Sequence, residues 1–174
     1  MILLIANIII GICLFALFTS IMINFAESMN KNIKKEKKSI VETGSMFAFF
    51  LVFYVLIRFK IGELAISDIL RIYLVIIGLI MVAVGCIINI MGRFNLGTNW
   101  ANQIKIYRKH SLIRTGVYGL VRHPLYASLM LMFYGACLVY PNYLAFLANT
   151  FVFIPFMYYR AKQEEYLLTK TFKE

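Results

Sequence analysis

Residues 124–159 read PLYASLMLMFYGACLVYPNYLAFLANTFVFIPFMYY, a stretch without one charged side chain. As a single α-helix it would extend about 54 Å, whereas about 20 apolar residues are enough to cross the hydrocarbon core of a bilayer. Pro141 and Asn142 lie at its middle and favour a turn, and the tyrosines beside them suit a membrane interface. The stretch therefore predicts a hairpin of two membrane helices, about 124–140 and 142–159.

Three further stretches lack charge, namely 1–26, 43–57 and 72–92, and 61% of the 174 residues are hydrophobic. The first stretch has no basic start and no small-residue cleavage pattern, so it predicts a retained helix rather than a signal peptide. The sequence thus predicts an all-α integral membrane protein with about five transmembrane helices in one compact domain. Residues 1–92 would supply three of them, and 93–174 the remainder.

The formal net charge is +10, which in a soluble protein would suggest nucleic acid as a partner. Here the basic residues concentrate in 30–38, in 93–122 and after 159. Alternation across five spans puts these three segments on one side, and the positive-inside rule makes that side cytoplasmic. We therefore expect a multi-pass protein with its N-terminus outside, membrane lipids as its surroundings and no nucleic acid. The sequence does not predict an oligomeric state.

Neither the cysteines nor the histidines have the spacing of a metal site. Cys13, Cys86 and Cys137 lie in three separate predicted spans, and His110 and His123 are thirteen positions apart. We expect no metal, and we expect the cysteines to act as small apolar side chains.

The segment 93–122 differs from the rest, because it is long, polar and free of acidic residues. Connections of this length are usually functional or disordered. Both histidines and Trp100, the single tryptophan, lie in it or at its end. Helix propensity over 105–113 predicts a turn or two of helix.

Two charged motifs flank the hairpin. Arg122-His123-Pro124-Leu125-Tyr126 opens its first helix, with proline where its missing N–H costs nothing. Arg160 and Glu164, after its second helix, are four residues apart and share a helical face. Each motif alone is also typical of an interfacial anchor or a solvated ion pair. Since the hairpin returns Arg160 to the side of His123, the pair predicts a basic, partly aromatic pocket at the cytoplasmic face, suited to a lipophilic anion and a polar cofactor.

Phosphate-binding and dinucleotide-binding glycine motifs are absent from the sequence. The order of its motifs instead resembles the isoprenylcysteine carboxyl methyltransferase family over residues 93–172, in a short, prokaryotic-type form. The matching positions are Leu96-Gly97-Thr98-Asn99-Trp100, Gln103, His110-Ser111-Leu112-Ile113, Gly116-Val117-Tyr118, Arg122-His123-Pro124-Leu125-Tyr126 and Arg160 with Glu164, Glu165 and Leu168. The family pattern continues with a Phe-Gly-x-x-Tyr segment, where this sequence has Phe172-Lys173-Glu174.

The resemblance implies S-adenosylmethionine as cofactor, bound in a loop at the cytoplasmic face. Carried over, the cofactor residues are Gln103, His110, Ser111, Leu112, Ile113, Tyr118, His123, Pro124, Leu125 and Tyr126. Arg160 and Glu164 match the catalytic and substrate-binding pair, and the lipophilic substrate enters between helices from the bilayer. An isoprenylcysteine carboxylate is already ionised at neutral pH and needs no general base, so Arg160 would hold it and Glu164 would orient Arg160.

Other readings remain open. A phospholipid amine or a small thiol could be the methyl acceptor on the same scaffold, and an amine would need Glu165 or His123 as base. The phospholipid enzymes carry Gly-x-Gly where this sequence has Gly116-Val117-Tyr118. Sterol reductases, which use NADPH, resemble the hairpin but have more spans. A non-enzymatic membrane protein that kept the pocket is the last alternative.

Overall fold

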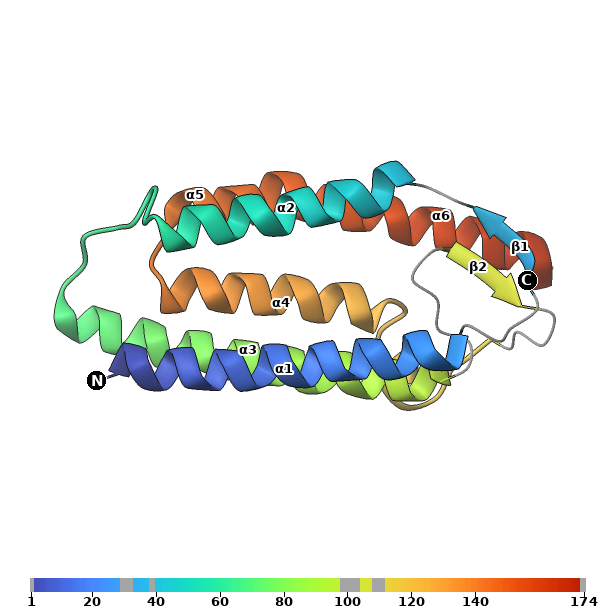
Figure 1. Ribbon diagram of the computed structural model, residues 1–174, viewed down its shortest axis with the longest axis horizontal. Helices are drawn as coiled ribbons and strands as arrows, with labels where there is room; N and C mark the ends of the chain where they lie inside the picture. Colours follow the sequence, from blue (N-terminus) through green and yellow to red (C-terminus); the bar gives the residue numbers. More distant parts are fainter. Residues whose placement is uncertain (1, 29–32, 38–39, 98–103, 108–111, 173–174) are drawn as a thin grey trace.

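The structure is a computed structural model that describes residues 2–28, 33–37, 40–97, 104–107 and 112–172. Most of these residues are helical. The helices are α1 Ile2–Ser28, α2 Ile40–Arg58, α3 Asp68–Leu96, the 3₁₀ turn η2 Gly116–Gly119, α4 Pro124–Val139, α5 Tyr143–Ala148, the π-helical turn η3 Asn149–Phe153 and α6 Ile154–Phe172. Since α5, η3 and α6 follow one another without a gap, they form one continuous rod (Figure 1).

The helices have the length and surface of membrane helices. Ile2–Ala26, Asp68–Leu96 and Tyr143–Thr171 are each long and apolar enough to cross a bilayer, and Gly44–Arg58 and Pro124–Val139 are shorter apolar helices. Large hydrophobic side chains point outward along them, such as Phe15, Ile69 and Phe151, each more than two-thirds exposed. A surface of this kind faces lipid rather than water. The predicted helical membrane class is confirmed, whereas the number of five spans stays a prediction.

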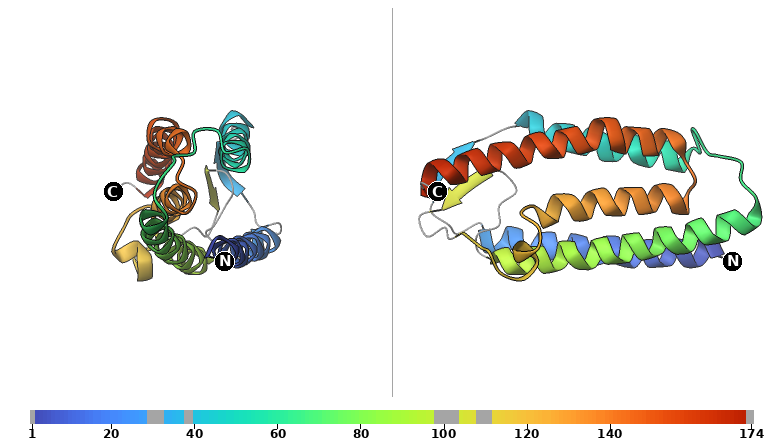
Figure 2. Two further views of the ribbon diagram at one scale, coloured as in Figure 1. Left: turned by 90° about the vertical axis from the view of Figure 1, so that its left-hand side faces the viewer. Right: turned by 180° about the vertical axis from the view of Figure 1, so that it is seen from behind.

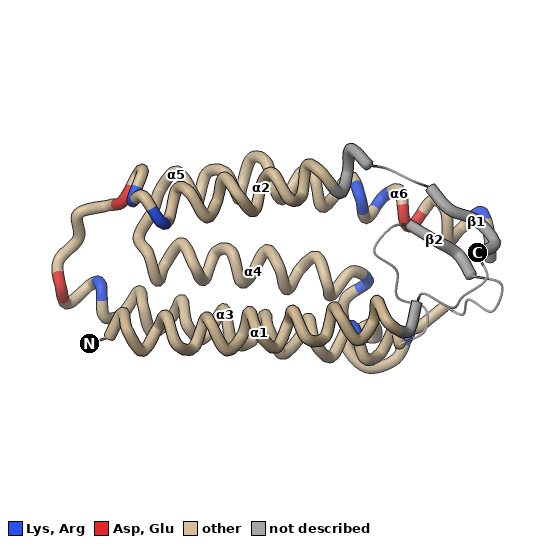
Figure 3. The backbone as a smooth tube through the Cα atoms, in the orientation of Figure 1, with Lys and Arg blue, Asp and Glu red and all other residues tan. Residues whose placement is uncertain are grey.

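The rods lie lengthwise beside one another, with α4 in the middle (Figure 1). Figure 2, left, shows α2 and the α5–α6 rod on one side of α4 and α1 and α3 on the other. Charged residues gather at the two ends of the bundle, and the length between them is almost free of charge (Figure 3). We call the end that carries strands β1 and β2 the sheet end, and the other the opposite end.

The opposite end contains the turn between α4 and α5. Asn142 caps α5 by accepting a hydrogen bond from the Ala145 N–H at 2.9 Å, and its amide donates to the carbonyls of Leu56 and Ile61 at 3.2 and 2.9 Å. The Leu64 N–H donates to the Pro141 carbonyl at 2.7 Å. The turn predicted around Pro141 and Asn142 is therefore confirmed, and it joins the hairpin to the connection after α2.

Glycines bring α3 and α4 into close contact. Gly78, Gly85 and Gly92 recur every seventh residue of α3 and all face α4. A Cβ at position 78 would lie 2.5 Å from the carbonyl oxygen of Gly135. In a bilayer, helices gain little from burying apolar side chains, because the lipid tails are equally apolar. Small residues instead let two helix backbones approach closely and pack well. The result is a tightly packed α3–α4 pair that carries the segment between them.

On the other side of α4, aromatic rings fill the space toward α2 and the α5–α6 rod. Phe49 of α2 stacks on Phe153 with centroids 4.7 Å apart, and Phe53 meets Phe133 of α4 edge-on at 4.6 Å. Phe153 lies in η3 and is 1% exposed. This cluster holds the α5–α6 rod against α4. The start of α4 and the C-terminal part of α6 then both lie at the sheet end (Figure 1).

Two local expectations were wrong. The turn or two of helix predicted over 105–113 is wrong at 105–107, and residues 108–111 lie outside the described residues. Strand β2, Ile104–Tyr107, forms there instead, because it pairs antiparallel with strand β1, Ile33–Lys37, from the connection after α1. Tertiary pairing here overrides local propensity. The last helix does not end near residue 159 but continues to Phe172, since residues 161–165 are mostly strong helix formers. The helix α3 runs past residue 92 to Leu96, and the division into 1–92 and 93–174 stays a prediction.

Candidate active site

The segment before α4 rests on the end of α3. The Asn95 side chain accepts a hydrogen bond from the Val117 N–H at 3.1 Å, which fixes the start of η2. Gly116 has a φ of +60° and lies directly against Asn95, where a Cβ would come far too close to that amide. Glycine is therefore required here by both backbone and space. From this turn the chain leads to His123, the N-cap residue of α4, and Pro124, its first residue.

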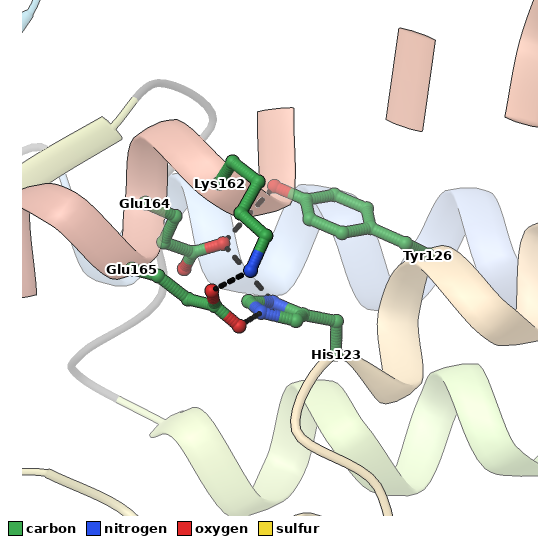
Figure 4. A network of polar contacts seen from close by, with 5 residues as sticks. All are labelled: His123, Tyr126, Lys162, Glu164 and Glu165. Atoms are coloured by element: carbon green, nitrogen blue, oxygen red, sulfur yellow. Dashed lines mark hydrogen bonds and ion pairs between the residues drawn. The ribbon is translucent and has the colours of Figure 1, made fainter. Parts of the chain in front are cut away.

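His123 links α4 to α6. Its Nε2 lies 3.1 Å from Oε1 of Glu165 and its Nδ1 lies 3.6 Å from Oε2 of Glu164 (Figure 4). The ring also stacks on Tyr126, one turn into α4, with centroids 5.7 Å apart. Both nitrogens therefore face carboxylates, an arrangement that matches the two N–H donors of a protonated imidazole.

Two more side chains extend this contact into a network, shown in Figure 4. The Tyr126 hydroxyl donates a hydrogen bond to Oε2 of Glu164 at 3.2 Å. Lys162 donates to Oε2 of Glu165 at 2.9 Å, from a position more than half exposed. We call His123, Tyr126, Lys162, Glu164 and Glu165 the His–Glu network. It links the start of α4 to the middle of α6 through polar contacts.

The surroundings shift the pKa values of two groups outside the membrane helices. Partial burial of His123 disfavours its charged form, but the hydrogen bonds and charges of Glu164 and Glu165 outweigh this and raise its pKa above 6.5. Burial raises the pKa of Tyr118, with the Glu164 charge as the next cause. The surroundings of His123 therefore favour its protonated form, whose two N–H groups face the two carboxylates, and those of Tyr118 favour the neutral phenol.

Arg160 lies one turn before Glu164 on α6 and is 7% exposed. Its Nη1 is 3.2 Å from the sulfur of Met46 in α2, and it also interacts electrostatically with the Tyr126 hydroxyl. As predicted from the hairpin, Arg160 and His123 lie at the same end of the bundle. Tyr126 contacts both Arg160 and Glu164, so its hydroxyl connects the two; the orienting role of Glu164 stays a prediction.

A cavity of about 720 Å³ opens between the segment before α4 and the face of α6. Its walls are Leu112, Ile113, Arg114, Tyr118, Gly119, Leu120, Val121, Arg122, His123, Glu165, Leu168 and Thr169. Four of the predicted cofactor residues are among them: Leu112, Ile113, Tyr118 and His123. Pro124, Leu125 and Tyr126 lie behind His123 in α4, and Gln103, His110 and Ser111 lie outside the described residues.

The comparisons with known proteins cover this same region. The sequence pattern of the Isoprenylcysteine carboxyl methyltransferase (ICMT) family matches residues 76–170, from within α3 to the end of the His–Glu network and beyond. This is more than half of the chain. The chain belongs to this family.

Two curated plant proteins resemble this ICMT-family chain. A probable protein-S-isoprenylcysteine O-methyltransferase of Oryza sativa subsp. indica is 33% identical over 98 residues, which is 55% of this chain and 51% of the rice protein. Protein-S-isoprenylcysteine O-methyltransferase A of Arabidopsis thaliana is 35% identical over 97 residues, 55% of this chain and 49% of its own length. The chain thus spans about half the length of the curated relatives it matches.

The structure of this ICMT-family chain adds residues that sequence reasoning left out of the site. Glu165 and Leu168 matched the family motif but were not assigned to the site, yet Glu165 contacts His123 and both residues line the cavity together with Thr169. These three share one helical face by their spacing. That spacing was visible in the sequence, because Arg160 and Glu164 already predicted a helical face after residue 159, but what this face contacts was not. Asn95 had no signal, because only the folded chain shows what it caps.

No three side chains of His, Cys, Asp or Glu gather around a possible metal position in residues 2–28, 33–37, 40–97, 104–107 and 112–172. The absence of a metal in this ICMT-family chain stays a prediction.

Proposed function

We propose that this protein transfers a methyl group from S-adenosylmethionine to the carboxylate of an isoprenylcysteine-like lipophilic substrate, at the sheet end of the bundle. The observation that carries the proposal is the His–Glu network beside the cavity. It joins the polar segment before α4 to α6, which carries the buried Arg160, at the boundary of an apolar bundle. Family membership and the names of the plant relatives support the same reaction class.

The cavity fits a cofactor of this kind. Its volume lies within the roughly 300–1,000 Å³ typical of small-molecule sites. Apolar walls from Leu112, Ile113 and Leu168 suit a flat base, and polar groups of Tyr118 and Glu165 can bind a ribose or an amino-acid portion. When bound, S-adenosylmethionine supplies an electrophilic methyl group on a sulfonium. The carboxylates near His123 would favour that positive charge, and the Tyr118 ring could contact it by its face.

Arg160 is suited to hold the acceptor. A guanidinium binds a carboxylate through two parallel hydrogen bonds, and a buried one does so with little competition from water. Tyr126 and Glu164, which lie beside it, would fix its orientation. The lipophilic part of the acceptor would remain among the helices, reached from the bilayer. Proximity and exclusion of water then carry most of the catalysis.

The state of His123 favours an acceptor that is already ionised. An amine must lose a proton before or during methyl transfer, so it needs an unprotonated base that is free to accept that proton in the site. The raised pKa of His123 and its contacts with both carboxylates leave neither His123 nor Glu165 arranged as such a base. A carboxylate acceptor needs none. This is why we favour the carboxylate over the phospholipid amine.

We place the sheet end in the cytoplasm and the N-terminus outside. Among the described residues, the sheet end carries the cations Arg93, Arg114, Arg122, Arg160, Lys162 and Lys170 against the acids Glu164 and Glu165, whereas the opposite end carries Arg58, Lys60 and Arg71 against Glu63 and Asp68 (Figure 3). The positive-inside rule then supports a cytoplasmic sheet end.

The proposal is tested with the purified chain in lipid nanodiscs, tritiated S-adenosylmethionine and N-acetyl-S-farnesylcysteine. We expect labelled product whose tritium is released as methanol by alkali, because methyl esters hydrolyse and N-methyl groups do not. Label that enters phosphatidylethanolamine and resists alkali would replace the carboxylate with an amine. Calorimetry with S-adenosylhomocysteine and NADPH separates the remaining classes: NADPH binding alone would identify a reductase, and binding of neither would contradict an enzyme.

A further inference from the structure

Asn89 is a fully buried amide within the apolar α3, and the structure satisfies it at each end. Its Nδ2 donates to the Leu125 carbonyl at 3.2 Å and to Oγ of Ser128 at 2.7 Å. Its Oδ1 accepts a hydrogen bond from Nε of Arg93 at 2.9 Å. A polar group in such a place is costly unless bonded, so these contacts hold it in one geometry.

The contact with Leu125 concerns the site directly. Leu125 is two residues after His123, in the first turn of α4. Gly92, one turn from Asn89, leaves room for this turn to lie on α3: a Cβ there would be 2.9 Å from a methyl of Leu125. Asn89 and Gly92 together therefore set where α4 begins, and with it the position of the His123 ring.

Arg93 continues the connection toward the cavity. It is 9% exposed, although an arginine near a membrane boundary could extend to the lipid headgroups instead. Its guanidinium lies near Tyr118, which lines the cavity, and the turn that carries Tyr118 is bonded to the end of α3 through Asn95 and the Val117 N–H. The bond from its Nε to Asn89 fixes the direction of the guanidinium.

We propose that Asn89 and Arg93 form a positioning pair that sets the Tyr118 ring and the start of α4 around the cavity, and so determines the affinity for the cofactor. The inference rests on the proposed function. Neither residue lines the cavity itself, so both act through Tyr118 and His123. Their effect belongs to cofactor binding rather than to the methyl-transfer step.

The test compares N89L, R93Q and R93K with the unchanged protein, all in nanodiscs. We expect N89L and R93Q to weaken S-adenosylhomocysteine binding about tenfold, the loss expected for one hydrogen bond to a charged group. The KM for S-adenosylmethionine should rise in parallel while kcat changes little. R93K keeps the charge near Tyr118 but loses the guanidinium fork, so its affinity should lie between those of R93Q and the unchanged protein. Because the two residues act as a unit, the N89L/R93Q double variant should bind no more weakly than the weaker single variant.

N149L is the matched control. Asn149 is also a fully buried asparagine, but it lies in η3, away from the cavity. We expect it to leave cofactor affinity and KM unchanged, whatever its effect on melting temperature. Unchanged affinity in N89L and R93Q, or a loss equal to that in N149L, would overturn the inference. Failure of the unchanged protein to bind S-adenosylhomocysteine would instead contradict the proposed function.

Discussion

A buried guanidinium beside a tyrosine hydroxyl makes Arg160 the residue whose chemistry is easiest to test. Replacing it with lysine keeps the charge but removes the planar fork that holds both oxygens of a carboxylate. We expect R160K to lower turnover about 10- to 100-fold, since a lost hydrogen bond to a charged group is worth about 1.5–3 kcal/mol. Turnover is measured as the rate of methyl-ester formation from N-acetyl-S-farnesylcysteine.

The control is Lys170→Ala, which removes an exposed cation from the same helix and should leave turnover intact. Binding of S-adenosylhomocysteine should be unaffected in both variants, because Arg160 is not among the residues that line the cavity. Full turnover by R160K would contradict a carboxylate-binding role.

His123 predicts a pH dependence of stability. Its pKa in the folded protein is above 6.5, so folding favours the protonated ring. The stabilisation is fully present below about pH 6.5 and is lost as the pH rises through the raised pKa. We expect the melting temperature of the protein to fall across that range relative to His123→Gln, which has no such titration. The melting temperatures are measured by thermal unfolding with a thiol-reactive dye that reports exposure of the buried Cys86 and Cys137. If the melting temperatures of the two proteins change with pH in parallel, the role of the His–Glu contacts is contradicted.

Among the elements, the α3–α4 pair depends on its glycines. Gly78→Ala would place a methyl 2.5 Å from the Gly135 carbonyl oxygen, so the helices must separate. Overpacking of this kind costs about 1–3 kcal/mol. We expect a lower melting temperature and weaker cofactor binding, since α4 carries His123. Gly11→Ala in α1 is the control, because nothing lies within 4 Å of that position, and it should be neutral or slightly stabilising.

The sequence predicted the elements well where hydrophobic length or a turn signal decided them. The turn at Pro141 and Asn142 and the proline start of α4 are examples, since each is determined by local backbone chemistry. It failed at residues 105–107, which were predicted to be helical but belong to a strand whose partner comes from a segment far away in the chain. The sequence-based prediction also ended the last helix too early. An uncharged stretch shows how long the apolar span is, but the helix can continue beyond it into charged residues.

The candidate site could be predicted in part for the same reason. Tyr118 and His123 were found by motif order, and both line the cavity. Asn89, as a polar residue inside a span, predicts a hydrogen bond to another helix, and the structure confirms it; Asn95 had no such signal, and which carbonyl or N–H each one meets appears only after folding. A polar residue inside a span shows that a partner exists but not which one.

For the molecule as a whole, the arrangement of the helices predicts which end of the bundle is accessible to a reagent added on each side of the membrane. Ile61→Cys at the opposite end should react with an impermeant maleimide added outside intact cells, and Lys170→Cys at the sheet end only after permeabilisation. Both positions are exposed, whereas Cys86 and Cys137 are buried and should remain unlabelled. The reverse pattern would contradict the cytoplasmic placement of the sheet end.

The His–Glu network joins residues 42 positions apart in the chain. At a synthesis rate of about 5–20 residues per second, the ribosome needs about 2–8 seconds to produce Glu165 after His123. During that interval α4 can enter the membrane and pack on α3, but its histidine has no carboxylate partner. The site is therefore completed only when α6 emerges and inserts, so a ribosome that stalls within the α4–α5 hairpin leaves a membrane-bound nascent chain whose cavity still lacks the wall that α6 supplies.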